Sequence, residues 1–200
     1  MIQVMVRAML VLVAGSLAMV AGAQNYSEGY KFLKAVRDRD GDVVTAMLEK
    51  PGSTVIDARE VSSGENALQI VIARQDLAWL GFLLSKGANA NQQDDSGNSP
   101  MMQAVETGFT EGVRRLLTAR ANVNLPNRSG ETPLIRAVQK RDVAMVRLLL
   151  ANGGDPDRRD VIAGMSARDY AKTDSRTPAI LKLIEEGKPK PAKGMSGPVL

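Results

Sequence analysis

Pairs of adjacent large aliphatic residues recur along the chain every 33 residues, and this period constrains the fold more than any other feature of the sequence. The pairs are Leu83-Leu84, Leu116-Leu117 and Leu149-Leu150. Twelve residues before each pair stands another apolar residue, in turn Val71, Ala104 and Ala137. A fixed period of about 20–50 residues is typical of proteins that stack one small unit many times. The sequence therefore predicts an elongated array whose core runs along its length.

Each unit is expected to contain a turn, a helix, a second turn and a second helix. The first helix should begin after a residue whose short polar side chain caps free N–H groups, and the candidates are Asn66, Ser99, Thr132 and Ser166. Two of these caps are followed by a proline at the first helical position, Pro100 and Pro133. A left-handed glycine is expected to end the second helix at Gly87, Gly153 and Gly187. The frame extends outward to Ala35 with Met47-Leu48 and to Ala171 with Leu183-Ile184.

Three of these units resemble ankyrin repeats, whose signature is G-x-T-P-L-H-x-A followed by L-L-x-x-G-A. Residues 129–154 (SGETPLIRAVQKRDVAMVRLLLANGG) carry it most fully, and residues 97–121 and 64–88 match the same frame. Residues 32–48 and 164–187 are weaker and resemble the terminal caps of such arrays. The resemblance implies an all-α ankyrin-repeat solenoid of about five helix-turn-helix repeats joined by β-hairpin-like turns. The repeats would span about 30–56, 57–91, 92–124, 125–157 and 158–187, which makes 30–187 the ankyrin-repeat domain.

The chain departs from the family pattern at two kinds of position. The motif histidine, which in the family links neighbouring repeats by hydrogen bonds, is replaced by Gln69, Met102, Ile135 and Asp169. Of these, Gln69 and Asp169 can still cap their own helix from its third position. The glycine between the two helices survives only as Gly108, and its place is taken elsewhere by Arg39, Gln75, Arg141 and Ser175. These residues, and Arg120 at a helix end, are expected at positive φ at a cost of about 1 kcal/mol each.

The two ends of the chain differ from the array. Residues 1–23 contain one charge, Arg7, then an uncharged apolar run and the small residues Ala21-Gly22-Ala23. This order predicts a signal peptide cleaved after Ala23, and hence a periplasmic or secreted protein. The alternatives are an uncleaved anchor or a buried helix. Residues 24–29 form a lead-in, and residues 188–200, rich in Pro, Gly and Lys, are expected to be a disordered basic tail.

Composition excludes several kinds of activity. The chain contains no histidine and no cysteine, which rules out Ser-His-Asp catalysis, histidine zinc sites and cysteine nucleophiles. Residues 24–186 carry 22 Lys/Arg and 22 Asp/Glu, so the body lacks the positive charge that nucleic-acid binding needs. Asp94-Asp95, Asp155-Pro156-Asp157 and Asp160 are interpreted as turn residues, and Trp79 and Phe82 as packing residues. No catalytic residue, metal site or cofactor is expected.

The resemblance implies a non-enzymatic protein that binds another protein through a concave face of hairpin tips and first helices. The residues at the family's variable contact positions are Arg37, Asp38, Glu65, Arg74, Asp95, Ser96, Asn98, Glu106, Thr107, Arg128, Ser129, Glu131, Gln139 and Lys140. We expect the free protein to be a monomer. The alternatives are a membrane- or envelope-associated adaptor, held by an uncleaved leader or the basic tail, and an enzyme with an unfamiliar carboxylate and lysine site.

Charge is distributed unevenly along the predicted array. Residues 51–112 carry eight acidic and three basic side chains, whereas residues 113–159 carry four acidic and ten basic ones. Because position in sequence is position in space in a linear stack, this contrast predicts an acidic and a basic end. Such a polarity would orient a partner and speed its approach.

Overall fold

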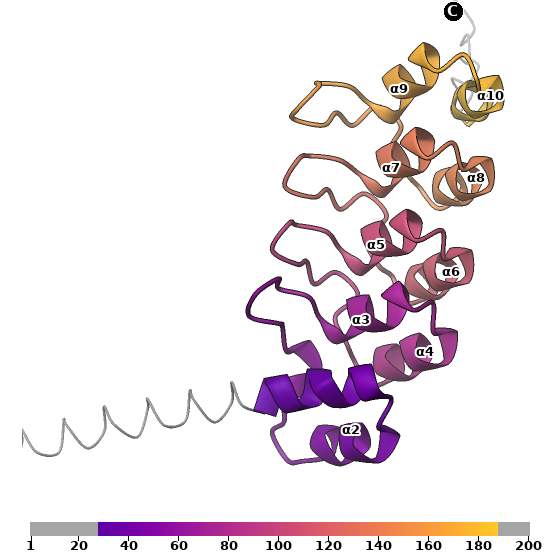
Figure 1. Ribbon diagram of the computed structural model, residues 1–200. Helices are drawn as coiled ribbons and strands as arrows, with labels where there is room; N and C mark the ends of the chain where they lie inside the picture. Colours follow the sequence, from indigo (N-terminus) through magenta and orange to yellow (C-terminus); the bar gives the residue numbers. More distant parts are fainter. Residues whose placement is uncertain (1–27, 188–200) are drawn as a thin grey trace, which may run out of the picture.

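Five pairs of short helices are stacked in one direction, each pair beside the next (Figure 1). The computed structural model describes residues 28–187, so the expected signal peptide, its cleavage site after Ala23 and the tail from residue 188 lie outside the described residues. The pairs are the helical run 28–38 with α2 (Gly41–Leu48), α3 (Ala67–Ala73) with α4 (Leu77–Ser85), α5 (Pro100–Glu106) with α6 (Thr110–Thr118), α7 (Pro133–Gln139) with α8 (Val143–Ala151), and α9 (Ala167–Thr173) with α10 (Pro178–Glu186). This arrangement confirms the predicted all-α repeat fold.

The core runs along the stack as the period predicts. First helices pack on first helices in the order α3, α5, α7 and α9, and each second helix packs on its own first helix. The small-residue column is buried throughout, at Ala35, Val71, Ala104, Ala137 and Ala171. Leu83, Leu116 and Leu149 are fully buried, one in each of the central repeats. Burial of about 0.8 kcal/mol per methylene along this continuous column is the main stabilising contribution.

The last repeat departs from the predicted register. Ile184 is the buried residue of its aliphatic pair and Leu183 is only half-buried. Ser175 is not at positive φ, and Gly187 ends α10 with φ −72° rather than in the left-handed region. The reason is the linker 174–177, which is one residue longer than the linker 140–142 and shifts α10 relative to the earlier second helices. Thr177, before Pro178, lies outside the helical region at φ −133° and ψ 65°. The expectations for Ser175, Leu183 and Gly187 were therefore wrong.

Caps begin the helices where the sequence places them. Asn66, Ser99, Thr132 and Ser166 each accept a hydrogen bond from the backbone N–H three residues later. Gln69 and Asp169 complete the predicted capping boxes. Aspartates cap three of the second helices, at Asp40, Asp76 and Asp142. At the same position α6 has Phe109, which makes no side-chain cap and instead covers Gly112.

Non-glycine residues at positive φ between the paired helices reach the next repeat. Arg39, Gln75 and Arg141 have φ of 60°, 56° and 57°. Arg39 pairs with Asp76 at 3.1 Å, Gln75 donates to the Thr107 carbonyl at 2.9 Å, and Arg141 donates to Asp174 at 2.6 Å. Each strained residue thus forms one bond across a repeat boundary. These bonds partly replace the inter-repeat role of the missing motif histidine.

A second series of hydrogen bonds joins the connectors, the segments that follow the second helix of each pair. Asp57 accepts from the Asn89 N–H, Asn91 from the Asn122 N–H, and Asn124 from the Asp155 N–H, at 2.7–3.2 Å. The next residue in this series is Asp157, whose carboxylate receives two hydrogen bonds from Arg168 within the last repeat. None of the helices in residues 28–187 combines the length and apolarity that a membrane crossing requires.

Candidate protein-binding face

Four hairpin loops project to the same side of the stack (Figure 1), and we call them the first to fourth fingers. They comprise residues 59–66, 93–99, 126–132 and 159–166. Each finger is bonded to the next through the backbone: the N–H groups of Asp95, Arg128 and Val161 donate to the carbonyls of Ser63, Ser96 and Ser129. These bonds measure 2.9–3.1 Å. The row of fingers is therefore one connected surface, which with the first helices we call the finger face.

One acceptor side chain organises each of the last three fingers. Asp94 accepts from the Ser96 and Asn98 N–H groups at 2.8 Å, and Asn127 accepts from those of Ser129 and Glu131 at 3.0 Å. Asp160 accepts from Ile162, Ala163 and Gly164 at 2.7–3.1 Å. The interpretation of Asp94 and Asp160 as turn residues agrees with these bonds. Asp94, Asn127 and Asp160 follow one another at intervals of 33 residues, and this spacing is a sequence signal for their shared role.

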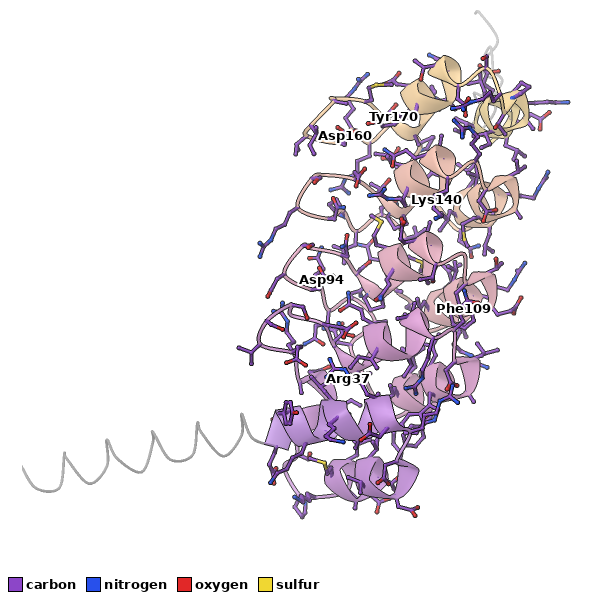
Figure 2. All side chains as sticks on the ribbon, in the orientation of Figure 1. Arg37, Asp94, Phe109, Lys140, Asp160 and Tyr170 are labelled. Atoms are coloured by element: carbon purple, nitrogen blue, oxygen red, sulfur yellow. The ribbon has the colours of Figure 1, made fainter. Side chains whose placement is uncertain are left out.

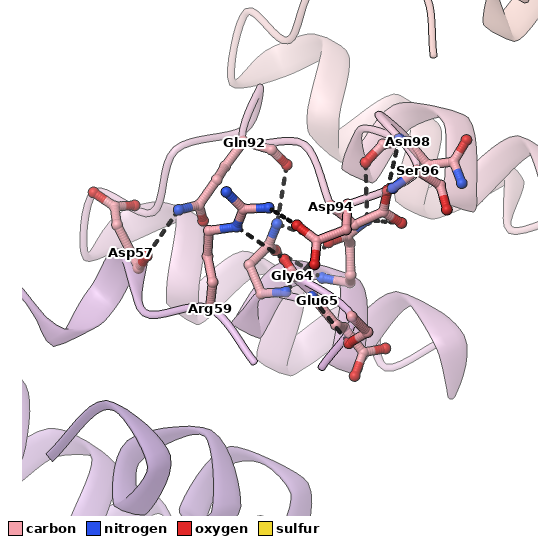
Figure 3. A network of polar contacts seen from close by, with 12 residues as sticks. Asp57, Arg59, Gly64, Glu65, Gln92, Asp94, Ser96 and Asn98 are labelled. Atoms are coloured by element: carbon pink, nitrogen blue, oxygen red, sulfur yellow. Dashed lines mark hydrogen bonds and ion pairs between the residues drawn. The ribbon is translucent and has the colours of Figure 1, made fainter. Parts of the chain in front are cut away.

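Asp94 and Asp95 connect the second finger to the preceding repeat (Figure 3). Gln69 donates to the Asp94 carboxylate at 3.2 Å and to the Asn98 carbonyl at 3.0 Å, while its own Oε1 accepts from Asn66. Arg59 of the first finger donates to Asp95 at 2.8 Å. Gln69 thus does more than cap its own helix: it forms the inter-repeat link that the family's histidine usually makes.

At the fourth finger, Tyr170 of α9 holds Asp160 from the other side (Figure 2). The Tyr170 hydroxyl donates to Asp160 at 2.7 Å, and Asp160 is buried. Burial alone would raise the pKa of Asp160, but the hydrogen bonds from Tyr170 and three backbone N–H groups outweigh it, so the pKa lies below its usual value. The same bond raises the pKa of Tyr170. The fourth finger is therefore held rigidly.

The predicted contact residues at the start of the array form a paired cluster. Arg37 contacts Glu60 at 2.8 Å and Glu65 at 3.1 Å, and Asp38 pairs with Lys34 on the exposed side of its helix. Burial alone would lower the pKa of Arg37, but the two carboxylates outweigh it and raise that pKa. Arg37 and Asp38 are exposed, and Glu65 is half-buried. These three side chains can be reached by a partner.

Arg74 and Thr107 lie differently. Arg74 donates to the Val36 carbonyl at 2.7 Å, and its guanidinium carbon lies 5.5 Å from the centre of the Trp79 ring. Its burial lowers the pKa of Arg74. Thr107 donates its hydroxyl to the Gln103 carbonyl within its own helix turn. Arg74 thus bonds the preceding repeat, and both residues are half-buried, as Glu65 is.

Four more of the predicted residues, Glu106, Glu131, Gln139 and Lys140, gather between α5 and α7, around Lys140 in Figure 2. Arg136 lies between Glu106 at 3.3 Å and Glu131 at 2.7 Å. Lys140 is 3.7 Å from Glu106, and Gln139 donates to Glu131 at 3.2 Å. We call Glu106, Glu131, Arg136, Gln139 and Lys140 the central charged cluster. The sequence analysis missed Arg136, although it is three residues after Pro133 on the same exposed side as Gln139.

A hollow of about 300 Å³ opens beside this cluster. Its lining comes from the second finger, α5 and α7: Asp94, Asn98, Met102, Gln103, Glu106 and Arg136. Met102, which replaces the motif histidine, is buried and contributes apolar surface here. A second hollow of about 410 Å³ lies between α7 and α9, lined in part by Gln139, Arg141 and Tyr170. The face therefore offers concave polar sites but no reacting constellation.

Exposed cations are divided between two faces of the molecule. Arg128 stands at the tip of the third finger, where Ser129 follows it, and has no ion pair within residues 28–187. Its backbone N–H donates to the carbonyl of Ser96 on the second finger. Arg114, Arg115 and Arg147, by contrast, lie on the second helices α6 and α8. The excess of basic residues in 113–159 is therefore only partly on the finger face. That face runs from acidic first and second fingers to a third and fourth that are closer to neutral.

A stack of helix pairs with a row of fingers is a repeat solenoid, a class whose members bind along one extended face. A family model described as ankyrin repeats, three copies, matches residues 32–126 and again residues 68–160. The chain belongs to the ankyrin-repeat family. Ankyrin repeats generally mediate protein–protein interaction, and proteins built from them are typically non-enzymatic. Within residues 28–187, no three acidic side chains come together to hold a metal ion.

Proposed function

We propose that this protein acts in the periplasm, or after secretion, as a non-enzymatic module that binds another protein through its finger face. The observation that carries the proposal is the central charged cluster beside the hollow of about 300 Å³. Glu106 and Lys140 remain substantially exposed in a site framed by two helices and a finger. Partly buried charges in a concave site recognise the charge pattern of a specific partner, whereas residues that only keep a protein soluble need no such site.

The contact residues proposed for this function are the predicted set, all of which are exposed or half-buried. They are Arg37, Asp38, Glu65, Arg74, Asp95, Ser96, Asn98, Glu106, Thr107, Arg128, Ser129, Glu131, Gln139 and Lys140. Because the first two fingers carry Glu60, Glu65, Asp94 and Asp95 against Arg59, we expect the partner to present basic residues toward that end. The opposite end, with Arg128, would face a neutral or acidic patch.

The test is affinity capture with the tagged full chain from the exported protein fraction. The double variant Arg128→Glu/Lys140→Glu should weaken capture at least tenfold and reduce its sensitivity to salt, because it removes two cations from the finger face. The matched control is Arg114→Glu/Arg147→Glu, which changes the net charge equally on the second helices and should bind as the wild type does. Equal capture by both variants would refute the assigned face.

Export is tested separately, because the leader lies outside the described residues. The mass of the purified protein should correspond to a chain beginning at Gln24 if the leader is cleaved. A mass that includes residues 1–23, together with recovery in the membrane fraction, would favour the adaptor held by its leader.

A further inference from the structure

Exposed apolar side chains gather at the two ends of the finger row. Residues 28–187 expose five large apolar side chains, and four of them lie on or beside the first and fourth fingers. At the fourth finger, Val161 and Ile162 are 74% and 79% exposed. At the first finger, Tyr30 and Val61 are 56% and 62% exposed. The equivalent tip positions of the two middle fingers hold polar residues instead, Asp95-Ser96 and Arg128-Ser129.

The two ends differ in shape. Val161 and Ile162 form a projection, which we call the knob. Tyr30 and Val61 border a hollow of about 220 Å³, which we call the socket, lined by Gly29, Tyr30, Leu33, Ala58, Arg59, Glu60 and Val61. A cavity of about 150 Å³ accepts a benzene molecule, so the socket has room for an aliphatic side chain. Both surfaces are mostly apolar, which makes them complementary in chemistry as well as in shape.

The knob is rigid, which lowers the entropic cost of inserting it. The Asp160 carboxylate holds the N–H groups of Ile162, Ala163 and Gly164, and Tyr170 holds that carboxylate in turn. The Val161 N–H is bonded to the Ser129 carbonyl at 2.9 Å. A buried carboxylate thus fixes a loop that presents two aliphatic side chains to water.

Backbone polarity at the two ends is also complementary. In each finger-to-finger bond, the acceptor is the carbonyl of the residue before the turn glycine of one finger. The donor is the N–H of the third residue of the next finger, which follows an Asp or Asn. The equivalent groups at the two ends of the row are the Ala163 carbonyl and the Val61 N–H, which follows Glu60. Within residues 28–187, the Ala163 carbonyl at the last finger and the Val61 N–H at the first make no hydrogen bond. One end therefore has an unused acceptor and the other an unused donor.

We propose that the knob of one copy of this chain binds the socket of a second copy, head to tail. The contact is heterologous, so each copy retains a free knob or socket, and association continues past the dimer as concentration rises. The surfaces involved are small, so the association is weak and the free protein is monomeric only when dilute. This inference is independent of the proposed partner on the finger face.

Sedimentation equilibrium of the full chain over a concentration series tests the proposal. The average mass of the wild type should rise continuously beyond that of two chains. Val161→Ser/Ile162→Ser, which removes the knob, and Tyr30→Ser/Val61→Ser, which alters the socket, should each remain monomeric. Val43→Ser, at the fifth exposed apolar residue on α2, is the matched control and should associate as the wild type does.

Mixing gives the decisive result. An equimolar mixture of the knob variant and the socket variant retains one intact knob and one intact socket, so it should form a species of two chains and none larger. Thermal unfolding of each variant at the wild-type temperature shows that its fold is retained. A wild type that stays monomeric or stops at two chains, variants that associate normally, or a mixture that stays monomeric would each overturn the head-to-tail contact.

Discussion

Equivalent positions in successive repeats of this chain hold different residues, which stabilise the structure by different contacts. At the capping position of the second helices, three aspartates bond the first turn, whereas Phe109 packs on Gly112. At the position between paired helices, three side chains tolerate positive φ and reach the next repeat, whereas Gly108 adopts φ 67° and reaches nothing. At each of these two positions, three residues make hydrogen bonds or ion pairs. The fourth residue packs on a neighbour, as Phe109 does, or adopts positive φ without strain, as Gly108 does.

Gly112 and Phe109 should be energetically coupled. A Cβ added at Gly112 would lie 2.3 Å from the Phe109 ring, so Gly112→Ala should destabilise the wild type by about 1–3 kcal/mol. In a Phe109→Asp background the ring is gone and a cap is restored, so the same alanine should be neutral or stabilise by up to about 1 kcal/mol. Urea unfolding of the four proteins of this cycle measures the coupling. Additive effects would contradict the assigned contact.

Asp160 should make stability depend on pH. Its pKa in the folded protein is below the unfolded value of about 3.9, so its charge stabilises the fold above that pH and the stabilisation is lost as pH falls through the folded pKa. Asp160→Asn keeps the acceptor for the backbone but loses the charge, which should cost about 1–2 kcal/mol at pH 7. The difference in unfolding free energy between the two proteins should shrink as the pH falls to about 3 and below. A difference independent of pH would contradict this.

Helices and their linkers show how the array compensates for the loss of its motif histidine. Gln69 bonds both its own cap and the next finger, whereas Met102 and Ile135, at the same position, are buried and contribute packing. The helix-end residue Arg120 has φ 59° but makes no side-chain bond within the described residues. Strain at Arg141 is therefore offset by its bond to Asp174, and strain at Arg120 is not.

This difference predicts opposite outcomes for two identical substitutions. Arg120→Gly should stabilise the protein by about 0.5–1 kcal/mol, because it relieves positive φ and breaks no contact. Arg141→Gly relieves the same strain but loses the ion pair with Asp174, so its net effect should be near zero or destabilising. Equilibrium unfolding in urea compares them. An Arg141→Gly protein more stable than Arg120→Gly would show that the bond does not offset the strain.

At the scale of the whole molecule, stability depends on neighbouring repeats. Only adjacent helix pairs contact each other extensively, and bonds cross each boundary at the fingers, between the paired helices and at the connectors. The last repeat covers α7 and α8 with α9 and α10. It therefore acts as the terminal cap of the array.

Removing that cap should affect the entire array. A chain ending at residue 157 leaves the buried faces of α7 and α8 exposed, so its thermal transition should move to lower temperature and its tendency to aggregate should increase. Circular dichroism during heating, with light scattering, measures both. An unchanged transition temperature would mean that the repeats are independent of their neighbours.

The sequence by itself determined the period, the helix pairs, the capping residues and the buried columns, because each depends on residues within one repeat and on spacing that recurs. It could also place the contact residues on one face, since the fingers recur with the same period. Only the tertiary structure decided how they are bonded: Arg74 donates to the Val36 carbonyl, Thr107 donates to the Gln103 carbonyl, and Arg136 joins the charged cluster. The longer linker before Pro178, the bridging role of Gln69 and the apolar ends of the finger row also emerged only there. These features depend on contacts between repeats, which the residues of one repeat do not specify.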